Sequence, residues 1–217
     1  MKVHRSFVWL ACLGMPLSAQ AAGGSVGGKV AAADGQGRPW VVYLEGGKVG
    51  TAATPAEPKE MLQKDMLFAP SALVVQAGTN VEFRNVDKIY HNVFSPTAGS
   101  EFDLGLYRGG ISKLQQMREP GEVDVYCNIH PGMHARILVV PNRLHAEVAA
   151  DGRYVIADVP PGRYTAVAWS ATHEPVRQAV EVAADRRASV DFAFKKRPFP
   201  LVPHANKDGD GYGRYKN

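Results

Sequence analysis

Residues 122–140 read EVDVYCNIHPGMHARILVV, and this stretch decides how the rest of the chain is interpreted. Apolar Val123 and Val125 alternate with polar residues up to Cys127, which predicts a β-strand that carries the thiol inward at its end. A Pro-Gly pair then predicts a turn, and the apolar run after it predicts a second strand returning beside the first. The sequence therefore places a short loop between two strands of one sheet.

This loop concentrates side chains that bind soft metals. Cys127, His130 and Met133 follow a Cys-x2-His-x2-Met spacing, and His91, in the segment YHNVFS, supplies a second imidazole from another predicted strand. Two His, one Cys and a weak axial Met form the ligand set of blue-copper electron-transfer sites. The sequence thus predicts one mononuclear copper site, at which the bound cation favours the thiolate. His134 directly follows the predicted axial Met133 and could compete with it.

The first residues have the pattern of an export signal. Lys2 and Arg5 precede a short apolar run, and a small-residue cleavage site ends at Ala21. We therefore expect residues 1–21 to be a cleaved signal peptide and the mature protein to reside in the periplasm. An alternative is lipidation of Cys12.

Cleavage would change both the cysteine count and the charge. Cys127 would be the only remaining thiol, which leaves a free thiol, an intermolecular disulfide or a metal ligand as its roles in an oxidising compartment. The balance would be 23 basic against 21 acidic residues, because cleavage removes two of the 25 basic residues and no acidic one. This balance argues against a nucleic-acid partner or a polybasic membrane surface. No stretch approaches the roughly 18 apolar residues of a transmembrane span.

The remaining patterns predict an all-β protein, and 217 residues suit two modest domains. Residues 23–47 contain two β-rich runs around an Asp-Gly turn signal, which predicts a hairpin. Alternating apolar residues predict half-buried strands within 67–85, and residues 142–195 have the strand spacing of a small sandwich. A helical period is present only weakly, over 57–66.

Two groups of motifs add a resemblance. The segments HNVF and YCNIHPGM resemble the plastocyanin-like cupredoxins, and the short ligand loop is most similar to that of amicyanin. The resemblance covers roughly residues 61 to 140. It implies a Greek-key β-sandwich with His91, Cys127, His130 and Met133 as copper ligands. It also implies that His130 faces solvent as the electron port and that electrons are transferred without substrate turnover.

The flanking segments GKVAAADG with VVYLE, and DGRYVIADVPPGRYTAVAW, resemble the two parts of a carboxypeptidase regulatory-like, transthyretin-type sandwich. The whole chain is similar to exported proteins labelled methylamine utilisation protein. This resemblance implies redox donor and acceptor proteins, such as a periplasmic dehydrogenase or a cytochrome, as partners. The implied organisation is a signal peptide (1–21), the first strands of a split sandwich (22–50), a linker (51–60), a cupredoxin domain (61–141), the remainder of the split sandwich (142–195) and a flexible tail (196–217).

Two other functions compete with electron transfer. A copper-delivery protein would use Met133 and His134 to hold an ion for transfer. An enzyme is disfavoured, because multicopper oxidases and nitrite reductases need additional His-x-His pairs that this sequence lacks. We also expect four histidines to lie at the surface and four aromatic residues to fill sandwich cores. These histidines are His134, His145, His173 and His204, and the aromatic residues are Trp40, Trp169, Phe192 and Phe194.

Overall fold

The described part of the protein is all-β, as the sequence predicts, and its strands form four sheets. The computed structural model describes residues 23–31, 40–47, 49, 57–194, 206, 207 and 209. Within these residues every regular element is a β-strand, and no helix long and apolar enough to cross a membrane is present. The predicted signal peptide and His204 lie outside the described residues.

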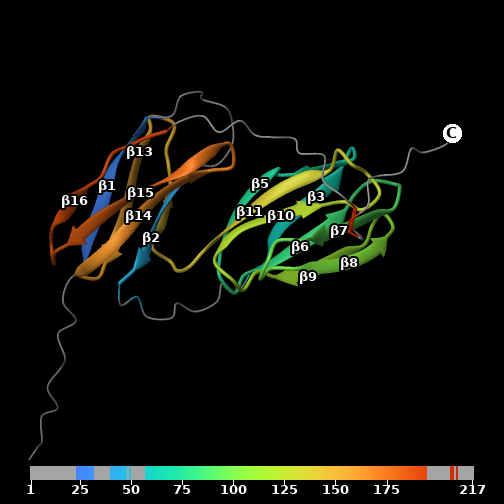
Figure 1. Ribbon diagram of the computed structural model, residues 1–217, viewed down its shortest axis with the longest axis horizontal. Coiled ribbons are helices and arrows are strands. Elements are labelled where there is room, and N and C mark those ends of the chain that lie inside the picture. The colour runs from blue at the N-terminus through green and yellow to red at the C-terminus, as the bar shows by residue number, and fades with distance from the viewer. Residues whose placement is uncertain are drawn as a thin grey trace, which may run out of the picture.

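Strands β3 to β11, from the middle of the sequence, form one sandwich, at the right of Figure 1, and this sandwich contains the ligand loop. We call it the central sandwich. Its two sheets share one apolar core, to which Met61 and Phe83 contribute from one sheet and Val125 and Ile137 from the other. The first sheet has the order β5 (Ala72–Gln76), β11 (His134–Val140), β10 (Gly121–Tyr126), β7 (His91–Ser95) and β8 (Phe102–Tyr107). The second sheet has the order β4 (Leu67–Ala69), β3 (Lys59–Lys64), β6 (Asn80–Asn85) and β9 (Ser112–Gln116).

A flanking sandwich is formed by strands from both sides of this segment. Its core joins Val26 and Ile156 of one sheet to Leu44 and Ala166 of the other. The first sheet has the order β13 (Arg153–Val159), β1 (Gly24–Ala31) and β16 (Arg187–Ser189), and β17 (Phe192–Ala193) also pairs with β1. The second sheet has the order β12 (His145–Glu147), β2 (Trp40–Gly46), β14 (Gly162–Ser170) and β15 (His173–Val182). The predicted domain boundaries themselves stay a prediction.

The predicted N-terminal hairpin is wrong. β1 pairs with β13 and β16, whereas β2 pairs with β12 and β14, so the two strands lie in opposite sheets of the flanking sandwich. A turn signal predicts where the chain changes direction, but it does not determine which strands form backbone hydrogen bonds with each other. The weak helical period over 57–66 is also overridden, because β3 pairs with both β4 and β6 there.

The ligand loop begins and ends as predicted. β10 and β11 are antiparallel, with Val123 opposite Ile137 and Val125 opposite Ala135. These four side chains are buried in the central core, and Cys127 follows them into it at the end of β10. The alternation in the sequence is therefore the alternation of the sheet.

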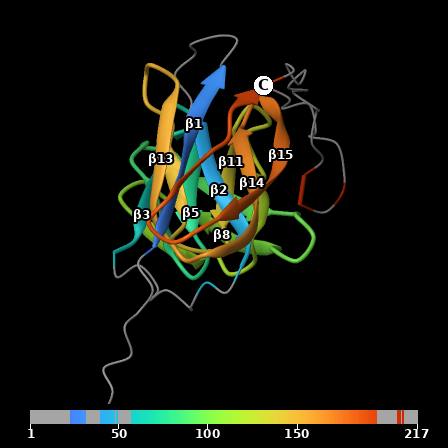
Figure 2. The same cartoon turned by 90° about the vertical axis from the view of Figure 1, so that its left-hand side faces the viewer.

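The two sandwiches pack against each other through a third apolar cluster. β11 is buried on both faces, because Ile137 and Val139 point into the central core while Leu138 and Val140 contact the flanking sandwich. From the other side, Trp169 on β14 is 1% exposed and belongs to the same cluster. Figure 2, which looks from the flanking side, shows that sandwich in front of the central one.

A hydrogen bond accompanies this apolar contact. The Trp169 Nε1–H donates to Glu122 Oε1 over 2.8 Å. Arg136 lies 3.2 Å from the second oxygen of Glu122, so the carboxylate joins the indole of one sandwich to the guanidinium of the other.

The predicted surface position of His173 is wrong. Its side chain is 0% exposed, and its ring lies 4.6 Å from that of Trp40 and 5.7 Å from that of Phe194. His145 is partly buried instead. Phe192 is part of the flanking core and Trp40 and Phe194 pack against it, as predicted, whereas Trp169 lies between the sandwiches.

Candidate metal centre

Three of the predicted ligands come together at one end of the central sandwich. The ligand atoms of His91, Cys127 and His130 all lie within 4.8 Å of one another. The two Nδ1 atoms are 3.0 Å apart, and the Cys127 Sγ is 3.6 Å from the His130 Nδ1. His91 and Cys127 are completely buried, whereas His130 is partly exposed.

Backbone contacts hold the ligand loop closed. His91 is the first residue of β7, and the loop leaves β10 at Cys127. The Cys127 N–H donates to the Met133 carbonyl over 3.3 Å, and the Met133 N–H donates to the His130 carbonyl over 3.0 Å. Met133 is completely buried in the same apolar core as Cys127. The short loop thus presents His130 toward the surface while Met133 is directed inward.

The measured spacings fit a single metal ion. Metal–nitrogen and metal–sulfur bonds of about 2.0 to 2.3 Å hold neighbouring ligand atoms roughly 3 to 4 Å apart. The His91–His130 and Cys127–His130 distances agree with this spacing, and the three ligand atoms all lie within 4.8 Å of one another. Burial lowers the pKa of His130, and the nearby His91 lowers it further, although Asp87 opposes this change. A lowered pKa favours the neutral imidazole, which is the form that binds a metal.

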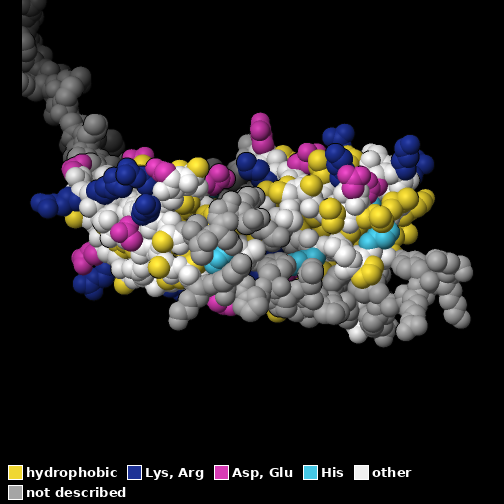
Figure 3. Space-filling view, turned by 90° about the horizontal axis from the view of Figure 1, so that it is seen from above, with side chains coloured by type: hydrophobic (Ala, Val, Ile, Leu, Met, Phe, Trp, Pro, Cys, Tyr) yellow, Lys and Arg dark blue, Asp and Glu magenta, His cyan; other side chains and the backbone are white. Residues whose placement is uncertain are grey.

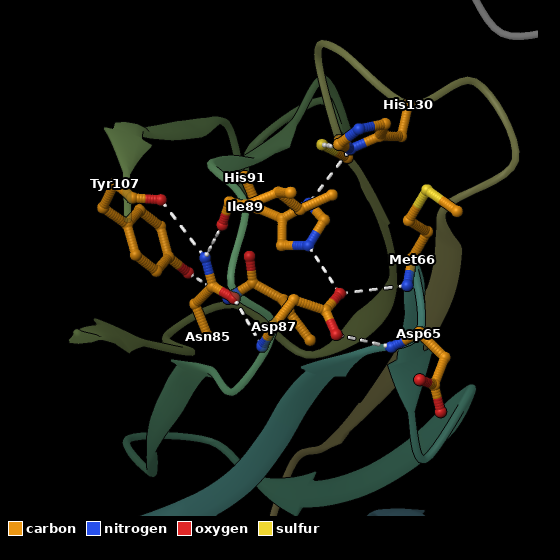
Figure 4. A network of polar contacts seen from close by, with 10 residues as sticks. Asp65, Met66, Asn85, Asp87, Ile89, His91, Tyr107 and His130 are labelled. Carbon is orange, nitrogen blue, oxygen red and sulfur yellow. Dashed lines mark hydrogen bonds and ion pairs between the residues drawn. The ribbon is translucent and has the colours of Figure 1, made fainter. Parts of the chain in front are cut away.

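Asp87 orients the buried histidine, and sequence analysis missed this residue. Its Oδ2 lies 2.8 Å from the His91 Nε2, on the opposite side of the ring from Nδ1 (Figure 4). The same carboxylate accepts hydrogen bonds from the backbone N–H groups of Asp65 (2.7 Å) and Met66 (3.0 Å). Metal-binding histidines commonly donate their second ring N–H to a carboxylate, which fixes the tautomer and the ring orientation.

The electrostatic environment keeps this carboxylate charged. Burial alone would raise the pKa of Asp87, but the hydrogen bonds from Met66, His91 and Asp65 outweigh burial and lower it. An ionised Asp87 accepts the His91 Nε2–H, so the His91 Nδ1 keeps its lone pair directed at His130. The only sequence signal would have been a carboxylate four residues before the histidine.

The side chain of Asn85, the last residue of β6, fixes the loop that carries Asp87. The Asn85 side chain donates to the carbonyls of Ile89 (2.9 Å) and Tyr107 (3.2 Å) and accepts from the Asp87 N–H (3.0 Å). Gly109 passes close to this loop, and a Cβ there would lie 1.9 Å from the Asp87 carbonyl oxygen. Only glycine permits this approach, so the position of Asp87 depends on Gly109.

We expect Asp87→Ala to weaken the affinity of this candidate site for added Cu(II) by about 10- to 100-fold, because the His91 ring would lose its orienting partner. Asp65→Asn is the matched control. Figure 4 shows the Asp65 side chain pointing away from Asp87, and asparagine tolerates its positive φ of 55°. Competition titrations with a chelator would measure both affinities. Equal affinities in the two variants would show that Asp87 does not support the site.

The predicted competitor His134 has other contacts. Its ring stacks on Tyr126, with the centroids 4.9 Å apart, and its Nε2 lies 3.2 Å from the Asp124 Oδ1. Asp124 also accepts from Arg136, at 2.7 Å from Nε. In the described part of the chain, His134 is not among the residues whose ligand atoms cluster with Cys127.

Exposed apolar side chains lie next to the site in the chain. Met66 lies in the turn bound by Asp87 and Leu67 follows it, and Ile89 and Tyr90 immediately precede His91. Each of the four is more than 40% exposed. Figure 4 shows Met66 and Ile89 near His91, and Figure 3 shows apolar side chains gathered at this end of the molecule. We call these four residues the apolar rim.

No family model and no curated protein matches this chain. Among solved structures, a purple cupredoxin from Nitrosopumilus maritimus is 20% identical with a TM-score of 0.34, and the match covers 37% of this chain and 98% of that one. A Cu(I) amicyanin variant is 20% identical with a TM-score of 0.36, covering 45% and 97%. A copper-containing nitrite reductase from Thermus scotoductus SA-01 is 26% identical with a TM-score of 0.37, covering 42% of this chain and 24% of that one. Each match is confined to less than half of this chain, so the candidate site rests on its own geometry.

Proposed function

We propose that this protein is a cupredoxin-like, mononuclear copper protein that carries single electrons between redox partners in the periplasm. The observation that carries the proposal is the convergence of two imidazole nitrogens and one thiol sulfur at one buried point. Thiolate with imidazole suits copper better than magnesium or calcium, which prefer oxygen ligands. Copper bound there would supply a one-electron redox couple.

The protein residues would hold this site in one geometry. Asp87 fixes the His91 ring, two backbone hydrogen bonds close the Cys127–Met133 loop, and both ligand segments begin or end strands of the same sheet. Ligands held in this way would move little when bound copper changes its oxidation state, which favours fast electron exchange over catalysis. Met133, which is buried in the same apolar core as Cys127, would supply a thioether as the fourth ligand.

The surface around the site supports exchange with another protein. His130 is the partly exposed ligand, and Met66 and Ile89 of the apolar rim lie near the His91 ring that it faces (Figure 4). An exposed apolar patch next to a redox ligand suits a transient protein interface, since it lets a partner approach closely and dissociate again. We propose a periplasmic dehydrogenase or a cytochrome as this partner.

Titration of the metal-free protein with Cu(II) tests the proposal. We expect one copper per chain, an intense visible thiolate-to-copper absorption band and reversible one-electron reduction. Copper bound without this band, or bound with the band but not reducible and reoxidisable, would overturn electron transfer. The first of these outcomes would favour copper delivery instead.

A further inference from the structure

The chain near its C-terminus contacts the candidate ligand loop. The Lys207 N–H donates to the Asn128 Oδ1 over 2.8 Å, although the two residues are 79 positions apart. The Lys207 Nζ lies 2.9 Å from the Asp103 Oδ2 on β8. Lys207 therefore binds two parts of the central sandwich at once, through its backbone and through its side chain. The sequence predicts a flexible tail for 196–217, and most of this segment lies outside the described residues.

These two contacts complete a closed ring of hydrogen bonds. The Asn92 Nδ2–H donates to the Asp103 Oδ1 over 2.7 Å, and the Asn128 N–H donates to the Asn92 Oδ1 over 3.3 Å. Asn92 immediately follows His91, and Asn128 immediately follows Cys127. The ring thus runs from the strand of one candidate ligand to the loop of the other, and Lys207 closes it from outside the sandwich.

The charges in this ring favour closure. Burial would raise the pKa of Asp103, but hydrogen bonds from Lys207, Gly105 and Asn92 and the charge of Lys207 together lower it. Asp103 is therefore ionised at neutral pH and accepts from Lys207, Asn92 and Gly105 at the same time. A single ion pair that is 38% exposed on both sides would contribute little. Lys207, however, also donates its backbone N–H to Asn128, so fixing this one residue gains two contacts.

We propose that Lys207 is a positioning residue that clamps the Asn92 and Asn128 segments together and so limits opening of the ligand loop. The consequence for copper retention rests on the proposed function, whereas the clamp itself does not. The clamp acts through the neighbours of the ligands, so it slows the loss of a bound ion without contacting it.

Hydrogen exchange at the Asn128 amide of the metal-free protein tests the clamp directly, because this N–H donates within the ring. We expect Lys207→Ala, which keeps the backbone donor, to speed this exchange about 3-fold. Lys207→Pro removes both donors and should speed it about 10-fold. Lys207→Arg keeps a cationic donor for Asp103 and should restore slow exchange. Lys64→Ala, which removes an exposed lysine on β3, is the matched control.

A double-mutant cycle shows whether the ring transmits the effect. In an Asp103→Asn background, Lys207→Ala should add little to the exchange rate, because the two changes remove the same contact. Release of copper to a chelator should be slowest in the control Lys64→Ala, faster in Lys207→Ala and fastest in Lys207→Pro. The free energy of unfolding should stay nearly constant in all three variants.

The two proposals fail in different ways. If no copper site forms but Asn128 exchange still accelerates in the Lys207 variants, the clamp stands and the copper function is wrong. If the copper band forms but Asn128 exchange and copper release match the Lys64→Ala control, the clamp is wrong and the copper function stands.

Discussion

Cys127→Ser is expected to abolish the intense visible absorption of the copper-loaded protein and to weaken copper binding by more than about 100-fold. Loss of a residue that merely orients a ligand costs 10- to 100-fold, and loss of the thiolate itself removes the soft ligand that favours copper. The Cys127 side chain is completely buried, with its Sγ 3.6 Å from the His130 Nδ1, so a thiol added to the solution cannot take its place as a ligand. Absorption spectroscopy and chelator competition on the same samples would measure both effects.

Two further variants make this prediction specific. His130→Gln should also lose the absorption band, because His130 supplies one of the three clustered ligand atoms. His134→Gln should retain it, because the His134 ring is bound to Asp124 and stacked on Tyr126. A band that survives in Cys127→Ser would rule out the thiolate as a ligand. A band that disappears in His134→Gln would restore His134 as a competitor of Met133.

Trp169→Ala is expected to lower the free energy of unfolding by about 3 to 5 kcal/mol, the usual cost of truncating a large buried aromatic side chain. Trp169 is 1% exposed between the two sandwiches, where it packs with residues of β2 and β11. Its removal would leave a cavity there and would also deprive Glu122 of the indole N–H. Urea unfolding monitored by circular dichroism measures the change.

Trp169→Phe separates packing from hydrogen bonding. Phenylalanine keeps most of the apolar volume but lacks the N–H, so we expect a loss of about 1 to 2 kcal/mol. Neither variant should change the copper absorption band, because Trp169 contacts Glu122 near the start of β10, whereas Cys127 follows the other end of this strand. A loss below about 1 kcal/mol in Trp169→Ala would mean that the two sandwiches do not stabilise each other through this contact.

The elements next to the site could be predicted because their signals are local. The alternation of Val123, Val125 and Cys127 follows from the two-residue period of a strand, and the Pro-Gly pair after His130 follows from turn geometry. The spacing of sulfur and imidazole groups similarly indicates the candidate ligands from the sequence alone. His91 was included on the chemistry of the set, and the fold brings it to His130.

The errors concern partners that are distant in the chain. The turn signal between β1 and β2 was present, but strands from residues 145 to 193 compete for their backbone groups and separate them into two sheets. His173 is polar and was expected at the surface, yet it is buried against Trp40 and Phe194, which are far apart in the chain.

Local patterns in the amino-acid sequence predict an all-β chain whose short loop, between two alternating strands, carries a thiol, an imidazole and a thioether. These features depend on residue type and on spacing within a few positions. The contacts that orient and enclose the loop arise only from tertiary packing: Asp87 binds His91, Gly109 packs against the Asp87 backbone, and Lys207 binds Asn128. These contacts depend on which distant segments pack side by side, and no local pattern records that choice.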